Sequence, residues 1–133
     1  MKIPSQTLYL LPRILAIVCI LFISMFALDA FNPKLTIWQQ IVGFFMHLIP
    51  SFILIIILII AWKKEFIGGV IFILLGLVFS PFIFIHNYRM NQSIWMSLLV
   101  IATITFPFIL IGILFILSHK RRKKEATSLS KNG

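Results

Sequence analysis

Four long apolar stretches, separated by short polar segments, dominate the sequence. Each is about 20 residues long, the length of helix that crosses roughly 30 Å of hydrocarbon. The expected membrane spans cover residues 8–28, 41–62, 66–85 and 94–118. The pattern therefore predicts an all-α integral membrane protein, an up-down four-helix bundle with short connections between neighbouring helices.

The polar segments indicate where the helices begin and end. Asn32-Pro33 follows the first span, and proline cannot continue a helix and restricts the residue before it. Thr36 and Gln39 have the spacing of a capping box, which predicts that the second helix starts at Thr36. Lys63-Lys64-Glu65 is long enough only for a tight connection. Residues 119–133 are basic and have too little apolar content to fold, so they are expected to form a disordered tail.

Small residues suggest which helix faces point into the bundle. They share one face of the third span (Gly69, Gly76 and Ser80) and roughly one face of the fourth (Ala102, Thr105 and Gly112). Small side chains let membrane helices approach closely, so we expect these faces to be interior. The alternative is that glycine is simply common in membrane helices.

Composition and charge agree with the membrane class. The chain is 61% hydrophobic and 11% charged, with a mean hydropathy of +1.10, whereas soluble domains are about half apolar and a quarter charged. The formal net charge is +9, but the basic residues lie at the ends of apolar runs rather than among aromatic residues on a polar surface. Nucleic-acid binding is therefore not expected.

The basic residues also predict the orientation. With both termini cytoplasmic, only Lys34 and Arg89 lie outside, and the cytoplasmic side holds Lys2, Arg13, Lys63, Lys64, Lys120, Arg121, Arg122, Lys123, Lys124 and Lys131. This distribution follows the positive-inside rule. It predicts a multi-pass protein of the bacterial inner membrane with both termini in the cytoplasm.

Anionic lipid headgroups are the expected contacts of the cytoplasmic cations. Arg13 lies one to two turns inside the first span, close enough for its guanidinium to reach lipid phosphates, with a buried partner as the alternative. The five basic residues after the fourth span, Lys120, Arg121, Arg122, Lys123 and Lys124, are expected to bind anionic lipid and to anchor the topology.

An outer-leaflet polar cluster is the main candidate for a site. Asp29 lies at the end of the first span, where the helix dipole is already negative and a carboxylate favours a nearby cation. Its candidate partners on the outer side are Lys34, His47, His86 and Arg89, of which the last three are preferred. The cluster could serve proton or ligand binding or act as a hydrogen-bonded plug, and a solvated Asp29 is the simpler alternative.

Recognised catalytic and cofactor-binding patterns are missing from the sequence. It has no nucleophile–base constellation, glycine-rich phosphate loop, HExxH or CxxC, and its single cysteine is Cys19. His47 and His86 differ in depth by roughly 6 to 8 Å of helix rise, which argues against axial haem ligation. We therefore expect no enzymatic activity, no cofactor and no metal.

Several segments resemble a known family. They are the run from Arg13 to Asp29, His47-Leu48-Ile49-Pro50-Ser51, Ala61-Trp62-Lys63 and Ile67-Gly68-Gly69. This sequence resembles, from about Leu8 to Leu117, small bacterial four-helix membrane proteins known only as a domain of unknown function. The resemblance implies a bacterial inner-membrane protein and assigns no catalytic or binding residue.

The sequence favours a non-enzymatic membrane component that associates with itself, as a homo-oligomer, or with a larger membrane partner. A proton- or ion-linked transporter or channel that uses Asp29, His47, His86 and Arg89 is the alternative, and a haem-binding redox subunit is a third hypothesis.

Overall fold

A computed structural model of the protein describes residues 3–133, which form four long helices. Helix α1 (Ser5–Met25) continues into a short 3₁₀ segment, η1 (Phe26–Ala30), and is followed by α2 (Ile37–Lys63), α3 (Glu65–Asn91) and α4 (Ile94–Asn132). Each of the four spans is long and apolar enough to cross a membrane. The prediction of an all-α protein with four such helices is confirmed.

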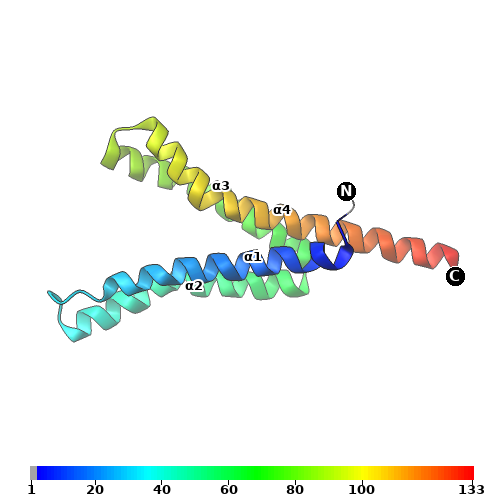
Figure 1. Ribbon diagram of the computed structural model, residues 1–133, viewed down its shortest axis with the longest axis horizontal. Helices are drawn as coiled ribbons and strands as arrows, with labels where there is room; N and C mark the ends of the chain where they lie inside the picture. The colour runs from blue at the N-terminus through cyan, green and yellow to red at the C-terminus, as the bar shows by residue number, and fades with distance from the viewer. Residues whose placement is uncertain (1–2) are drawn as a thin grey trace.

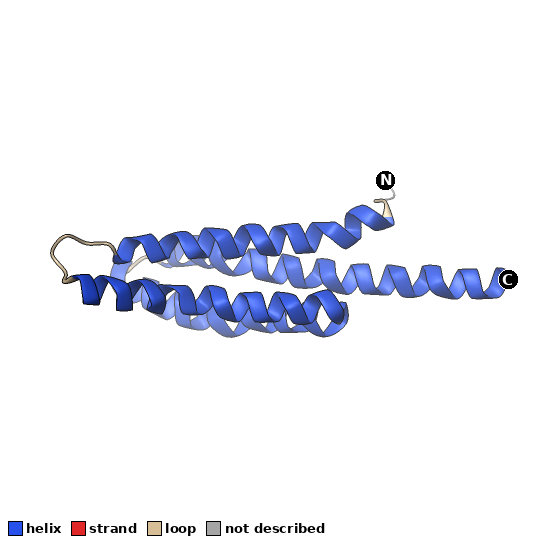
Figure 2. Ribbon diagram, turned by 90° about the horizontal axis from the view of Figure 1, so that it is seen from below, coloured by secondary structure: helices blue, strands red, loops and turns tan. Residues whose placement is uncertain are grey.

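The helices form two antiparallel hairpins, α1–α2 and α3–α4 (Figure 1). Both termini and the α2–α3 connection lie toward one end, which we call the termini end; the connections at residues 31–36 and 92–93 lie at the opposite, loop end (Figures 1 and 2). The hairpins approach each other at the termini end and diverge toward the loop end (Figure 1). The molecule is therefore a bundle that is closed at one end only.

Helices α3 and α4 pack closely because two glycines face each other. A Cβ atom on Gly69 would lie 2.7 Å from the carbonyl oxygen of Gly112, and a Cβ on Gly112 would lie 2.5 Å from that of Gly69. A Cβ on Gly76 would similarly lie 3.1 Å from the carbonyl oxygen of Thr105, which is itself buried. The small-residue faces are therefore interior as predicted, except that Ala102 is exposed, and the structure shows that they meet where α3 packs on α4.

The hydrophobic core lies in the half of the bundle nearer the termini end. It takes residues from all four helices: Ala16, Ile20, Leu54, Ile57, Leu58, Ala61, Phe72, Ile111 and Phe115. Beside it, a hydrogen bond of 2.9 Å from Ser24 Oγ to Ser51 Oγ joins α1 to α2. Hydroxyl contacts of this kind add to close packing in holding membrane helices together.

The predicted start of α2 is confirmed, and the predicted disordered tail is wrong. Thr36 and Gln39 form the complete capping box at the start of α2. Beyond Ser118, α4 continues as helix to Asn132. The residues from Lys120 to Ala126 are good helix formers, and an i,i+4 pair links Arg121 to Glu125 at 3.5 Å, so local interactions stabilise this part of the helix without apolar contacts.

Candidate functional site

A buried ion-pair cluster joins α1, α3 and α4 at the termini end. One carboxylate oxygen, Glu65 Oε1, accepts hydrogen bonds from Arg13 Nη2 at 2.8 Å, Arg122 Nη1 at 3.2 Å and Ser118 Oγ at 3.3 Å. The side chains of Arg13 and Glu65 are 1% and 6% exposed, whereas that of Arg122 is 57% exposed. We call these four residues the ion-pair cluster.

Aromatic side chains surround the Arg13 guanidinium. Its central carbon lies 3.5 Å from the ring centroid of Tyr9, 5.3 Å from that of Trp62 and 5.4 Å from that of Phe115. The Nη1 group also donates to the backbone carbonyl of Tyr9. Cation–π attraction is stronger where water is excluded, so these rings help to offset the cost of burying the cation.

The local fold explains how these side chains meet. Glu65 is the first residue of α3 and follows the Lys63-Lys64 connection directly. A Cβ atom on Gly68 would overlap Ala61, so glycine at this position lets α3 begin in contact with the end of α2. On α4, Ser118 and Arg122 are four residues apart and therefore share one face.

The charges of the cluster do not cancel. Two guanidinium groups face one carboxylate, so the cluster carries a net positive charge at neutral pH. A buried cation is tolerated when it is paired and hydrogen-bonded, and Glu65 provides that pairing for Arg13. One residue at the start of α3 thus fixes the positions of α1 and α4 at the same point.

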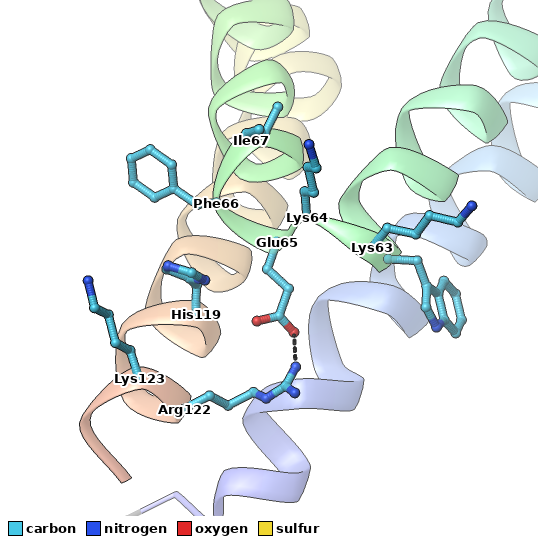
Figure 3. A pocket seen from close by; sticks show the side chains of 9 residues that line it. Lys63, Lys64, Glu65, Phe66, Ile67, His119, Arg122 and Lys123 are labelled. Atoms are coloured by element: carbon cyan, nitrogen blue, oxygen red, sulfur yellow. Dashed lines mark hydrogen bonds and ion pairs between the residues drawn. The ribbon is translucent and has the colours of Figure 1, made fainter. Parts of the chain in front are cut away.

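A basic pocket lies beside the cluster at the α2–α3 connection (Figure 3). This termini-end pocket has a volume of about 600 Å³ and is lined by Trp62, Lys63, Lys64, Glu65, Phe66, Ile67, His119, Arg122 and Lys123. Figure 3 shows the Glu65 side chain directed toward Arg122, with His119 and Lys123 on the same side of the pocket as Phe66. The pocket therefore combines several cations, one neutralised acid and an aromatic wall.

A second cavity lies between the two hairpins. This interhairpin cleft has a volume of about 290 Å³, and its lining is apolar apart from one threonine: Ile23, Pro50, Ile53, Leu54, Leu75, Phe79, Ile83, Ile104, Thr105 and Phe108. All four helices contribute to it. It lies where the hairpins begin to diverge, next to the hydrophobic core.

The expected outer-leaflet cluster is not assembled in the structure. Asp29 and His47 belong to the α1–α2 hairpin and His86 and Arg89 to the α3–α4 hairpin, and the two hairpins end apart (Figure 1). All four side chains are exposed, and no hydrogen bond or ion pair joins any two of them. His47 Nδ1 instead lies 2.7 Å from the carbonyl oxygen of Gly43 on its own helix. The prediction assumed that helices at equal depth meet, and the divergence of the hairpins separates the pair Asp29 and His47 from the pair His86 and Arg89.

The residues expected to contact lipid headgroups have different positions. Arg13 lies inside the bundle, so its expected headgroup contact is replaced by the pair with Glu65. Arg122 contacts Glu65 while remaining half exposed, and Arg121 donates to the carbonyl of Ile3 and pairs with Glu125. The remaining lysines of the run, Lys120, Lys123 and Lys124, are exposed, and Lys123 lines the termini-end pocket.

Sequence reasoning missed Glu65, although a signal for it was present. The chain has three acidic residues in total, and Glu65 is placed beside the same end of the bundle as Arg13 by the expected topology. An intramembrane cation and a lone acid on one side of a bundle form a natural pair. Because Lys63-Lys64-Glu65 was interpreted only as a connection between helices, the pairing of Glu65 with Arg13 was not predicted.

Comparisons with known proteins give one match. A family model described as a domain of unknown function (DUF7670) matches residues 1–127, which include all four apolar helices as far as the extension of α4. No curated protein and no solved structure matches the sequence. Within residues 3–133, no three His, Cys, Asp or Glu side chains are grouped so that they could hold a metal ion.

Proposed function

The chain belongs to the family described as a domain of unknown function (DUF7670), and we propose that it is a non-enzymatic membrane component that acts by associating with itself or with a larger membrane partner. The interhairpin cleft is the observation that carries this proposal. An apolar opening between two hairpins offers a place where a further helix can pack.

The distribution of buried residues supports this reading of the cleft. In α3 the buried residues end at Gly76, and in α2 they begin at Ser51. The loop-end halves of these helices are therefore largely exposed, and they carry large apolar side chains such as Phe45, Phe79 and Phe82. Membrane helices associate by close packing rather than by a hydrophobic drive, so a helix that interdigitates with the cleft gains contacts that fluid lipid provides less well.

The location and orientation belong to the same proposal. We place the protein in the bacterial inner membrane with both termini in the cytoplasm. The excess of lysine and arginine at the termini end supports this orientation. The ion-pair cluster and the termini-end pocket then lie near the cytoplasmic headgroups.

Proton- or ion-linked transport has weaker support than association. That alternative depended on Asp29, His47, His86 and Arg89 forming one cluster, and they lie on hairpins that end apart. The haem hypothesis also needs His47 and His86 to meet, and it has weaker support because they are exposed residues of different hairpins. The association proposal depends on the interhairpin cleft alone and does not require these polar residues to meet.

Two phenylalanines of α3 provide a matched test. Phe79 lines the cleft, whereas Phe82, three residues further along, does not, and both are more than half exposed in the single chain. Self-association of the full chain in liposomes is measured by energy transfer between labelled copies, and partner binding by quantitative co-purification after mild detergent extraction. We expect Phe79→Ala to weaken association about tenfold, equivalent to ~1.4 kcal/mol, and Phe82→Ala to leave it unchanged.

The proposal is refuted by either of two results. One is a chain that stays monomeric in liposomes and also co-purifies with no stoichiometric partner. The other is an equal effect of Phe79→Ala and Phe82→Ala, because the association would then not involve the cleft.

A further inference from the structure

The termini-end pocket has an excess of positive charge. Four cationic side chains line it, Lys63, Lys64, Arg122 and Lys123, and its one acid is Glu65. The Glu65 oxygen that faces the pocket cations already accepts from Arg13, Ser118 and Arg122. Among residues 3–133, the ion pairs are those of Arg13 and Arg122 with Glu65 and of Arg121 with Glu125. The three lysines of the pocket are therefore available for an added anion.

The start of α3 adds to the same positive potential. Glu65, Phe66 and Ile67 line the pocket and form the first turn of a 27-residue helix, and no side chain caps this turn. The first backbone N–H groups of a helix have no acceptor within the helix, and the helix dipole is positive at this end. The backbone and the lysine side chains thus favour an anion in the same cavity.

The apolar residues that line the rest of the pocket indicate which class of anion the pocket favours. Trp62, Phe66 and Ile67 supply the apolar part of the lining, at the point where the candidate membrane spans of α2 and α3 meet. The ring of Phe66 lies 5.8 Å from that of His119, which closes this part of the lining against α4. A ligand that fits both surfaces carries a phosphate group next to glycerol and hydrocarbon.

We propose that the termini-end pocket binds the phosphate of an anionic phospholipid. Lys64 and Lys123, which lie apart in Figure 3, turn toward the bound phosphodiester together with Arg122, while Trp62 and Phe66 contact the glycerol and the start of the acyl chains. A cavity of about 600 Å³ accommodates a phosphoglycerol headgroup. The site lies at the opposite end of the helices from the divergence that opens the interhairpin cleft, so it is independent of the proposed association.

The test compares two pairs of lysines on the full chain. Lys64→Gln with Lys123→Gln removes two charges from the pocket, and Lys120→Gln with Lys124→Gln removes two charges from exposed positions of α4 outside it. Each variant is reconstituted in nanodiscs of phosphatidylcholine with or without phosphatidylglycerol, and retained lipid is counted by native mass spectrometry. We expect the pocket pair to weaken phosphatidylglycerol retention about 30-fold and the control pair to change it by less than about threefold.

Two further arms identify the role of charge and the source of the phosphate. Lys64→Arg with Lys123→Arg keeps the charge and is expected to retain the lipid. Inorganic phosphate added to the phosphatidylcholine nanodiscs is expected to give no adduct, because it lacks the apolar part that contacts Trp62 and Phe66. Equal losses in the two glutamine pairs would overturn the proposal by showing only diffuse attraction. Saturable binding of inorganic phosphate that is lost in the pocket pair would overturn the lipid assignment in favour of a soluble phosphate.

Discussion

Removing the Glu65 carboxylate is expected to destabilise the bundle strongly. In Glu65→Ala, Arg13, whose side chain is 1% exposed in the native structure, loses the one acidic partner that it has among residues 3–133. Arg122 also loses that partner, but its side chain is 57% exposed and is solvated by water or headgroups instead. The cost therefore arises almost entirely at Arg13.

The size of the effect follows from this difference in burial. Breaking a buried ion pair by removing one partner costs about 3–5 kcal/mol, whereas an exposed pair contributes about 0–1 kcal/mol. The cation–π contacts of Arg13 with Tyr9, Trp62 and Phe115 remain in the variant and keep the cost toward the lower figure. A loss of about 3 kcal/mol is a large share of the ~5–15 kcal/mol that stabilises a typical domain.

The measurement is the free energy of unfolding in mixed micelles titrated with a denaturing detergent, followed by helical circular dichroism. Glu125→Ala is the matched control, because Glu125 is 49% exposed and pairs with Arg121 at 3.5 Å, so its removal should cost at most about 1 kcal/mol. The double variant Arg13→Met with Glu65→Met removes both charges and should recover most of the loss. The reasoning fails if Glu65→Ala costs no more than Glu125→Ala, or if the double variant is less stable than Glu65→Ala.

Three further predictions test the packing and the topology. Gly112→Leu places a side chain against the Gly69 carbonyl and should separate α3 from α4, lowering the free energy of unfolding by more than the ~1–3 kcal/mol typical of overpacking, as seen in the same detergent titration. Thr36→Ala removes the capping box of α2 and should cost about 1 kcal/mol in that titration, whereas no measurable cost would contradict the cap. A reporter that is active only outside the cytoplasm, fused after Lys124, should be silent, and activity there would reverse the proposed orientation.

The course of the helices could be predicted from the sequence because it depends on local patterns. Three kinds of feature can each be recognised within a short stretch of the sequence: the apolar stretches, the Thr36–Gln39 capping box, and the glycines Gly69 and Gly112 on their helix faces. Hydropathy and helical periodicity give the depth of each residue and the face on which it lies. These quantities predicted the four helices and the inward direction of the glycine faces correctly, whereas the contact of Gly69 with Gly112 is known from the structure.

The candidate site could not be predicted in the same way because it depends on the distance between hairpins. Asp29 and His86 share an expected depth, yet they belong to two hairpins that diverge toward the loop end. Arg13 and Glu65 are 52 positions apart in the sequence, and their contact requires the α2–α3 connection to turn so tightly that Gly68 meets Ala61. Depth alone does not determine how far apart two helices lie.

The separation of Arg13 and Glu65 along the chain also has a consequence for biosynthesis. Synthesis runs from the N-terminus, so α1 reaches the membrane with Arg13 while its counter-ion, 52 residues later, has not yet been made. An uncompensated arginine within a span is costly, and its long stem allows the charged group to extend to the headgroups in the meantime. A chain cut before Glu65 retains that exposed charge permanently, whereas the complete chain withdraws it into the bundle. A chain that ends at Lys64 therefore exposes the Arg13 charge that the full chain buries. We expect this truncated chain to be degraded faster than the full chain in a pulse-chase measurement.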